Sequence, residues 1–210
     1  MPTSDDISPS LLFTLAFAAA LLLGLALKFW LATRRGRHVA RHRTEVPTPF
    51  AERIALAAHQ KAADYTITKA RLGMLEMALG AAVLLGWTLL GGLDALNQAL
   101  LGVLGGGMWQ QMAFLVAFAA ISGLIDLPLS LYQTFVVEER FGFNKMTWRL
   151  WLADALKGLL VGAIIGLPIA ALILWLMGAA GPLWWLWAWC FWMGSVSYTH
   201  LRAHETRGNL

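Results

Sequence analysis

The sequence has little charge and almost no cysteine. Only 13% of its 210 residues are charged, whereas 59% are hydrophobic, and an ordinary soluble domain carries about 25% charged residues. The single cysteine, Cys190, excludes an intramolecular disulfide and a cysteine-based metal site. The low charge and the long apolar runs exclude a disordered chain and a soluble globular enzyme. The composition therefore predicts an integral membrane protein whose surroundings are a lipid bilayer.

The excess of positive charge does not indicate nucleic-acid binding. The formal net charge is +4 and 9 of the 16 lysines and arginines lie within 34–71, directly after the first apolar run. No basic face with interleaved aromatic residues and no nucleic-acid motif accompanies them. This placement is typical of membrane topology, so we expect no nucleic-acid partner.

Apolar runs predict an all-α, polytopic membrane protein. A helix needs about 20 apolar residues to cross a bilayer, and four runs are long enough, at 11–32, 72–93, 108–131 and 158–177. A fifth run, 183–196, has only 14 residues. The sequence therefore predicts four full transmembrane helices and a truncated fifth.

Loop charges predict the orientation of these helices. Lysine and arginine number 0 before the first run, then 9, 0, 4 and 0 in the segments 33–71, 94–107, 132–157 and 178–182. Because positive loops stay in the cytoplasm, the N-terminus is expected outside, with loops 33–71 and 132–157 cytoplasmic.

Capping residues and glycines predict the helix ends. Thr48 and Pro49 predict a helix that begins at Phe50 and continues into the second span, and Thr147 predicts a cap for a helix from Trp148. The glycines at 91–92 and 105–107 predict the two ends of an outside loop.

Two acidic residues fall within the apolar runs, near their predicted cytoplasmic ends. Glu76 and Asp126 can reach water there, or a basic partner such as Arg71 or Arg140. An intramembrane acid suggests function by default. Their position favours a paired structural residue over a proton relay.

The densest polar cluster is the segment 132–147. Its composition predicts a cytoplasmic loop in which the paired carboxylates Glu138 and Glu139 can form a salt-bridge network with Arg140 and Lys145. Gly142 with Asn144 is expected to make a turn. It supplies no nucleophile and no metal site.

This segment resembles the signature of the N-terminal membrane region of Ste24-type CAAX prenyl proteases, the M48 zinc metallopeptidases. The resemblance covers about 10–195, and the second similar stretch is 59–66 with the lysine, arginine and leucine after it, which looks like bacterial members. The signature positions, expected to organise the cytoplasmic rim of a chamber, are Tyr132, Thr134, Phe135, Glu138, Glu139, Arg140, Phe141, Gly142, Phe143, Asn144, Lys145, Asp154 and Lys157.

The resemblance implies a membrane metalloendopeptidase in the bacterial inner membrane. In that family a barrel of helices surrounds a chamber, and Zn²⁺ is bound by the two histidines of an H-E-x-x-H helix and a later glutamate. Zinc lowers the pKa of its bound water to about 7, and the motif's glutamate activates that water. The substrates implied are prenylated CAAX proteins, or membrane-associated and misfolded proteins in bacteria.

The sequence departs from that family at the catalytic motif. It has five histidines but no H-E-x-x-H. His200 and His204, with Glu205 beside them, lack an evident third ligand, and His38 and His42 lie among arginines that would repel a dication. We therefore predict no catalytic residue, no metal ligand and no bound cofactor on this chain, and no proteolysis by it alone.

The C-terminal residues have a different character. Apolar sequence stops near Ser195, and the residues beyond it resemble translated sequencing-adapter read-through. The expected organisation is a membrane region over 1–195 and a non-native tail over 196–210, with the catalytic segment missing. The alternative is a non-enzymatic membrane scaffold or a small transporter subunit that uses Glu76 or Asp126.

Overall fold

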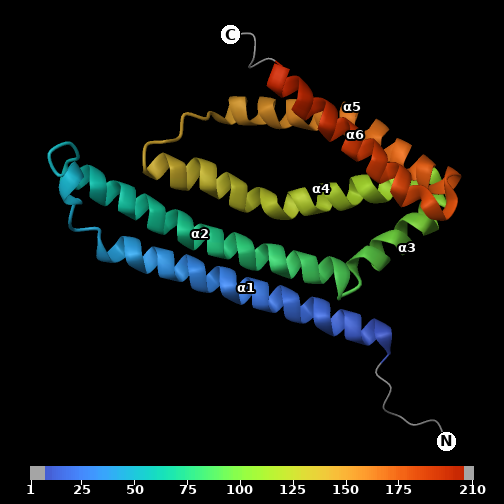
Figure 1. Ribbon diagram of the computed structural model, residues 1–210, viewed down its shortest axis with the longest axis horizontal. Helices are drawn as coiled ribbons and strands as arrows, with labels where there is room; N and C mark the ends of the chain where they lie inside the picture. The colour runs from blue at the N-terminus through green and yellow to red at the C-terminus, as the bar shows by residue number, and fades with distance from the viewer. Residues whose placement is uncertain (1–7, 206–210) are drawn as a thin grey trace, which may run out of the picture. The chain divides into compact units, whose positions relative to one another are not determined.

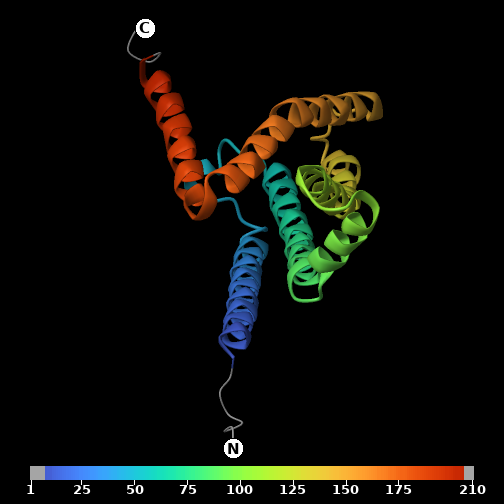
Figure 2. The same ribbon diagram turned by 90° about the vertical axis from the view of Figure 1, so that its right-hand side faces the viewer.

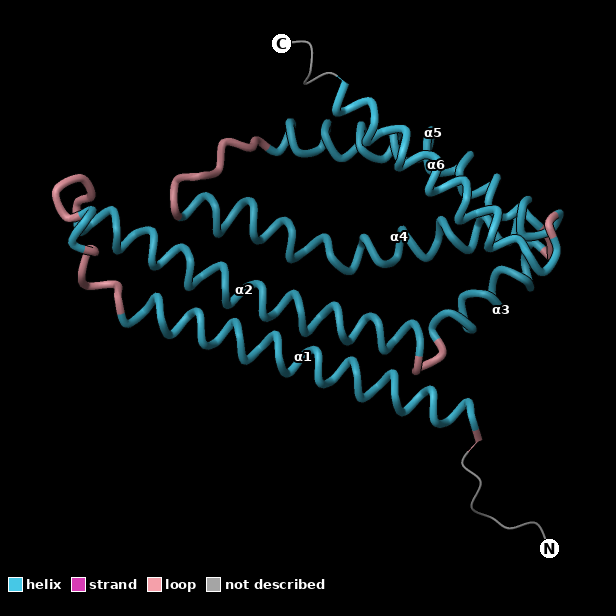
Figure 3. Tube along the Cα trace, in the orientation of Figure 1, coloured by secondary structure: helices cyan, strands magenta, loops and turns pink. Residues whose placement is uncertain are grey.

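The structure is a computed structural model that describes residues 8–205, without the side chains of 195 and 198–205. Every element in that range is helical (Figures 1 and 3). In chain order the elements are α1 (Pro9–Arg41), the 3₁₀ turn η1 (Thr48–Phe50), α2 (Leu56–Thr88), α3 (Gly92–Leu104), α4 (Met108–Tyr132), the π-helix η2 (Gln133–Glu138), α5 (Trp148–Ala179), the 3₁₀ turn η3 (Gly181–Leu183) and α6 (Trp184–Glu205).

Four helices of the described chain are long and apolar enough to cross a membrane. They are α1, α2, α5 and the continuous helix formed by α4 and η2. They contain three of the predicted spans in full and the second, 72–93, up to Thr88, so the prediction of an all-α, polytopic membrane protein is confirmed. Their apolar stretches contain almost no residue that is buried within the described chain, as expected where lipid or further protein covers a helix.

The chain divides into two compact units. The first comprises 1–96 and 120–146, and the second comprises 97–119 and 147–210. In the first unit α1 and α2 lie side by side along much of their length, and Thr33 Oγ1 approaches Met74 Sδ at 3.9 Å. In the second unit α5 and α6 contact each other next to η3 (Figure 2).

The helix that leads into the second span begins later than predicted. The expected start at Phe50 is wrong, because η1 ends there and no side chain caps it, and α2 begins at Leu56. The expected continuity with the second span is confirmed, since α2 runs unbroken to Thr88, but the predicted end of that span at Leu93 is wrong because the chain turns at Gly91. Thr147 caps α5 as predicted, with Oγ1 accepting a hydrogen bond from Leu150 N at 3.2 Å.

The segment expected to be an outside loop, 94–107, forms most of α3. Its leucines recur at helical spacing and Asp94 lies in the first turn, where a negative charge favours a helix N-terminus. Gly91, with φ of +81°, makes the turn between α2 and α3, and Gly105, with φ of +68°, follows α3. The predicted glycine positions are therefore confirmed as turns, and the loop between them is not.

The signature segment is also more helical than predicted. Its first half continues α4 as η2, and helical backbone extends to Arg140. Val137, in η2, is 2% exposed. This apolar turn packs against α2. That tertiary contact keeps the segment helical, although its composition alone predicts a loop.

The last helix, α6, extends its backbone to Glu205. Residues 206–210, and the side chains of 198–205, lie outside the described part of the chain. The expectation of a non-native tail over 196–210 stays a prediction.

Candidate functional site at the junction of α2 and η2

A small apolar core joins α2 to the signature segment. Leu72 and Phe141 are each 7% exposed, and Val137 is the most buried member. Tyr65 and Leu129 pack against these three residues. Since α2, α4, η2 and the loop after η2 all contribute, this core fixes where the polar groups around it lie.

Glu138 is the central polar group of the site. Tyr65 and Lys69 are one helical turn apart on α2 and face the same carboxylate. The Tyr65 hydroxyl donates to Glu138 Oε1 at 2.8 Å and to Oε2 at 2.9 Å, and Lys69 Nζ donates to Oε1 at 3.1 Å. The Glu138 side chain is 20% exposed, so this charge depends on these donors more than on water.

The loop after η2 folds back on Glu138 and on its neighbour Glu139. The Glu138 carbonyl accepts from Phe143 N at 2.9 Å and from Asn144 N at 3.2 Å, and the Glu139 carbonyl accepts from Gly142 N at 2.9 Å. Asn144 Nδ2 donates to Glu139 Oε2 at 3.0 Å. The turn predicted at Gly142 is therefore confirmed, with φ of +73°.

Aromatic rings complete the packing of the loop against α2. Tyr65 meets Phe141 edge-on at 5.3 Å and Phe143 at 4.8 Å between ring centroids. Lys61 Nζ lies 5.8 Å from the Phe143 ring, and Arg140 Cζ lies 5.8 Å from the Phe141 ring. Such cation–π contacts keep a charge close to an aromatic face without a carboxylate.

The predicted salt bridges of Glu138 and Glu139 with Arg140 and Lys145 are wrong. Glu138 pairs with Lys69 on α2, and Glu139 with the Asn144 amide. The physical reason is that Glu138 faces α2, where the Tyr65 hydroxyl and Lys69 Nζ both donate to its carboxylate.

The intramembrane acids also have other neighbours than predicted. In the amide orientation that suits its surroundings, Gln133 donates to Glu76 Oε1 at 3.1 Å and accepts from Lys69 Nζ at 3.2 Å. Glu76 and Asp126 line one cavity of about 270 Å³ with Gln133. The sequence left water or a basic partner open for these acids, and neither acid forms an ion pair with Arg71 or Arg140 in the described chain.

A second ion pair ties the segment after α1 to α2. Arg43 donates two hydrogen bonds to the Asp64 carboxylate, from Nε to Oδ1 at 2.7 Å and from a terminal guanidinium nitrogen to Oδ2 at 2.8 Å. The hydrogen bond to the Asp64 carboxylate, reinforced by the charge of that group, raises the pKa of Arg43 above its ordinary value. His59 Nε2 also donates to the His42 carbonyl at 2.8 Å.

The remaining signature residues are spread over the two units. Thr134 lines the cavity of the two acids, Tyr132 is 51% exposed, and Lys145 lies on the surface. Asp154 and Lys157 belong to the second unit, where they form an exposed pair at 4.0 Å.

Sequence reasoning missed three members of the site: Tyr65, Lys69 and Gln133. A signal for the first two was present, because both lie in or next to the second stretch that resembles the family and are four residues apart. Gln133 lies within the signature segment, but at a position where the resemblance fixes no residue type.

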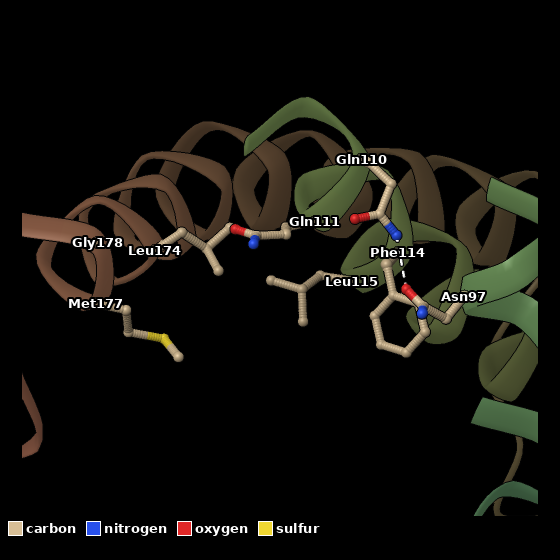
Figure 4. A pocket seen from close by; sticks show the side chains of 8 residues that line it. All are labelled: Asn97, Gln110, Gln111, Phe114, Leu115, Leu174, Met177 and Gly178. Carbon is tan, nitrogen blue, oxygen red and sulfur yellow. Dashed lines mark hydrogen bonds between the residues drawn. The ribbon is translucent and has the colours of Figure 1, made fainter. Parts of the chain in front are cut away.

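A separate cavity lies within the second unit (Figure 4). It has a volume of about 450 Å³ and is lined by amides and apolar side chains from α3, α4 and α5. Gln110, only 5% exposed, donates to Asn97 Oδ1 at 2.8 Å. None of the lining residues titrates, so the cavity offers no acid or base.

The described residues do not fit a zinc ion. Nowhere among them do three histidine, cysteine, aspartate or glutamate side chains gather into a group that could hold a metal. The side chains of His200, His204 and Glu205 lie outside the described ones.

Residues 35–199 match the family model described as CAAX prenyl protease N-terminal, five membrane helices. The chain belongs to this family. The resemblance noted in the signature segment is thereby confirmed, and the site at the junction of α2 and η2 lies within the matched region.

Relatives with known names are longer than this chain. It is 29% identical over 188 residues to CAAX prenyl protease 1 homolog of Homo sapiens, covering 83% of this chain and 39% of that protein. It is 49% identical over 65 residues to CAAX prenyl protease 1 of Saccharomyces cerevisiae, covering 31% and 14%. The crystal structure of S. mikatae Ste24p aligns with a TM-score of 0.75 at 26% identity, covering 92% of this chain and 46% of that one. The chain thus spans less than half the length of these relatives.

Gly142 gives a direct test of the loop geometry. An alanine there must adopt a left-handed conformation that costs about 1–2 kcal/mol, although the space is open apart from Lys61 Nζ at 3.8 Å. We expect Gly142→Ala to lower the free energy of unfolding by that amount in detergent micelles. The control is Gly158→Ala in α5, which meets nothing within 4 Å and should be neutral or slightly stabilising. Equal effects of the two variants would contradict the strain argument.

Proposed function

We propose that this chain is the membrane-embedded N-terminal part of a zinc-dependent metalloendopeptidase that cleaves membrane-associated or prenylated proteins. The observation that carries the proposal is the match of 35–199 to the membrane region of CAAX prenyl proteases. Relatives are more than twice as long, which leaves room for a catalytic segment outside this chain.

In this proposal the zinc site belongs to the rest of the parent protein. The sequence holds no H-E-x-x-H, and no group of ligands forms among the described side chains. No catalytic step is therefore assigned to residues of this chain.

The junction of α2 and η2 is proposed to brace the cytoplasmic rim of the protease. Glu138 accepts hydrogen bonds from two side chains of α2 and, through its carbonyl, from two backbone amides of the loop. One residue therefore connects three segments, and a network satisfied in this way holds them in one arrangement. The rim would lie in the cytoplasm of a bacterium, with the N-terminus outside the inner membrane.

One observation favours the alternative of a transporter subunit. Glu76 and Asp126 share a cavity with the Gln133 amide, which is an arrangement that solute passage can use. If that alternative were correct, replacing both acids by their amides would abolish solute uptake into vesicles that contain the chain.

The protease proposal predicts that activity depends on a segment that this chain lacks. We expect the purified chain to leave a farnesylated CAAX-type peptide intact. A chimera in which 1–195 replaces the aligned region of Ste24p should cleave it in a manner sensitive to 1,10-phenanthroline. Cleavage is measured by mass spectrometry, with intact Ste24p as the positive control.

Two results would contradict the proposal. Chelator-sensitive cleavage by the chain alone would place the chemistry within these residues. A chimera that is folded by circular dichroism and monodisperse, yet inactive, would show that the chain does not serve as a protease membrane region.

A further inference from the structure

The end of α1 presents two opposite faces. One face has the half-buried positions Ala32, Gly36 and Val39, and Arg43, two residues after the end of α1, binds Asp64 of α2. With 3.6 residues per turn these positions lie on one side of the helix. The side facing α2 is therefore made of small or apolar residues, with Thr33 at its edge, where the hydroxyl lies 3.9 Å from Met74 Sδ.

The other face carries a row of arginines. Trp30, Arg34, Arg37 and Arg41 succeed one another at intervals of three or four residues and are all exposed. The Arg34 guanidinium carbon lies 5.6 Å from the Trp30 ring. With Phe29, Thr33 and His38 these residues line a hollow of about 540 Å³, here called the arginine groove.

The arginines of the groove have no acidic partner in the described chain. The ion pairs of the first unit engage Arg43 with Asp64 and Lys69 with Glu138. Arg34, Arg37 and Arg41 form none within 4.0 Å. The positive charge of three guanidinium groups on about two turns of helix is thus not neutralised within the described chain and can attract an external anion.

The depth of the groove in the membrane can be derived from the helix rise. The apolar run of α1 ends at Ala32, and each further residue advances about 1.5 Å. Arg34 therefore lies about 3 Å, and Arg41 about 13 Å, beyond the end of the hydrocarbon core. A headgroup layer is about 5–8 Å thick on each side, so the groove begins at the level of lipid phosphates. Trp30 lies where indole rings prefer to be, at the interface.

We propose that the arginine groove binds the phosphate of an anionic phospholipid, with Phe29 and Trp30 against the upper part of its acyl chains. A guanidinium fork matches phosphate oxygens, and basic clusters next to a span attract anionic lipids. The groove continues directly from the apolar run, which a soluble phosphate compound or a nucleic acid would not require. This site is independent of the proposed proteolysis.

The test compares lipid retention by purified variants of the chain. Native mass spectrometry in detergent measures bound dioleoyl phosphatidylglycerol and, separately, dioleoyl phosphatidylcholine. The test variant carries Arg34→Gln, Arg37→Gln and Arg41→Gln. The control carries Arg53→Gln, Arg71→Gln and Arg149→Gln, and so removes the same charge from other positions. Six of the nine basic residues of 33–71 remain in the test variant, so the orientation signal is preserved.

We expect the wild-type chain to retain phosphatidylglycerol at least fivefold better than phosphatidylcholine. One arginine near a membrane surface contributes about a fivefold effect, so the test variant should lose tenfold or more of that binding. The control should stay within twofold of wild type. Equal losses in the two triple variants would show a general charge effect and overturn the proposal, as would an absence of preference in the wild type.

If the triple variant does not fold, a single variant provides a second measurement. The single variant Arg37→Gln replaces one exposed side chain, and it should reduce retention of phosphatidylglycerol about fivefold with an unchanged circular dichroism spectrum. Retention equal to that of wild type would count against the groove.

Discussion

Replacing Phe141 by alanine should cause the largest loss of stability of any single change in the first unit, about 3 kcal/mol. Truncating a buried phenylalanine typically costs 3–5 kcal/mol, because contacts are lost and a cavity remains. Phe141 is 7% exposed, and its ring meets Tyr65 edge-on. The lower end of the range applies because the core around it has only three buried members. Unfolding by dodecyl sulfate in maltoside micelles, monitored by circular dichroism, measures the loss.

Phe143 is a matched control for this experiment. Its ring lies even closer to Tyr65, at 4.8 Å between centroids, but the side chain is 55% exposed. Phe143→Ala should therefore cost about 1 kcal/mol or less, the size of an exposed aromatic contact. If the two variants lost the same stability, burial at Phe141 would not be what holds the loop to α2.

The membrane architecture was predictable from the sequence because the bilayer fixes the length of a span. Four runs of about 20 apolar residues identified the four long helices, and the caps at Thr147 and the glycine turns set several of their ends. The wrong start at Phe50 has a local cause, since Thr48 and Pro49 make only a 3₁₀ turn without a side-chain cap.

Two other segments are helical where the sequence predicted a loop, for different reasons. The segment 94–107 contains no charge besides Asp94, and its leucines at helical spacing form α3 between the glycine turns. The segment 133–140 has charged residues and β-branched residues, which are weaker helix formers, but burial of Val137 keeps it helical.

The site residues in the signature segment were predictable from the sequence, whereas their partners on α2 were not. The resemblance pointed to the glutamates and the turn at Gly142, which lie together in sequence. Their partners Tyr65 and Lys69 are 73 and 69 residues away from Glu138. Adjacent opposite charges suggested Arg140 and Lys145 as partners, and only the register of η2 against α2 decides between near and distant cations.

The ion pair between Glu138 and Lys69 can be tested by mutation. We expect Glu138→Gln to lower the free energy of unfolding by about 2 kcal/mol, because Lys69 then keeps its charge beside a neutral amide. Breaking a fully buried pair costs about 3–5 kcal/mol. The Lys69 side chain is 39% exposed, so solvent reduces that figure. The same micelle titration measures the change.

A double-mutant cycle separates the pair from its surroundings. Glu138→Gln and Lys69→Met should couple by about 1–2 kcal/mol, since each variant alone removes the same ion pair. The control is Asp154→Asn with Lys157→Met, whose side chains are 52% and 75% exposed at 4.0 Å and should couple by less than about 0.5 kcal/mol. Equal coupling free energies of the two pairs would mean that the enclosed position of Glu138 does not strengthen its ion pair with Lys69. A larger coupling at Glu138 would support the view that η2 turns this carboxylate inward to brace α2, because an exposed pair of the same charges gains almost nothing from its geometry.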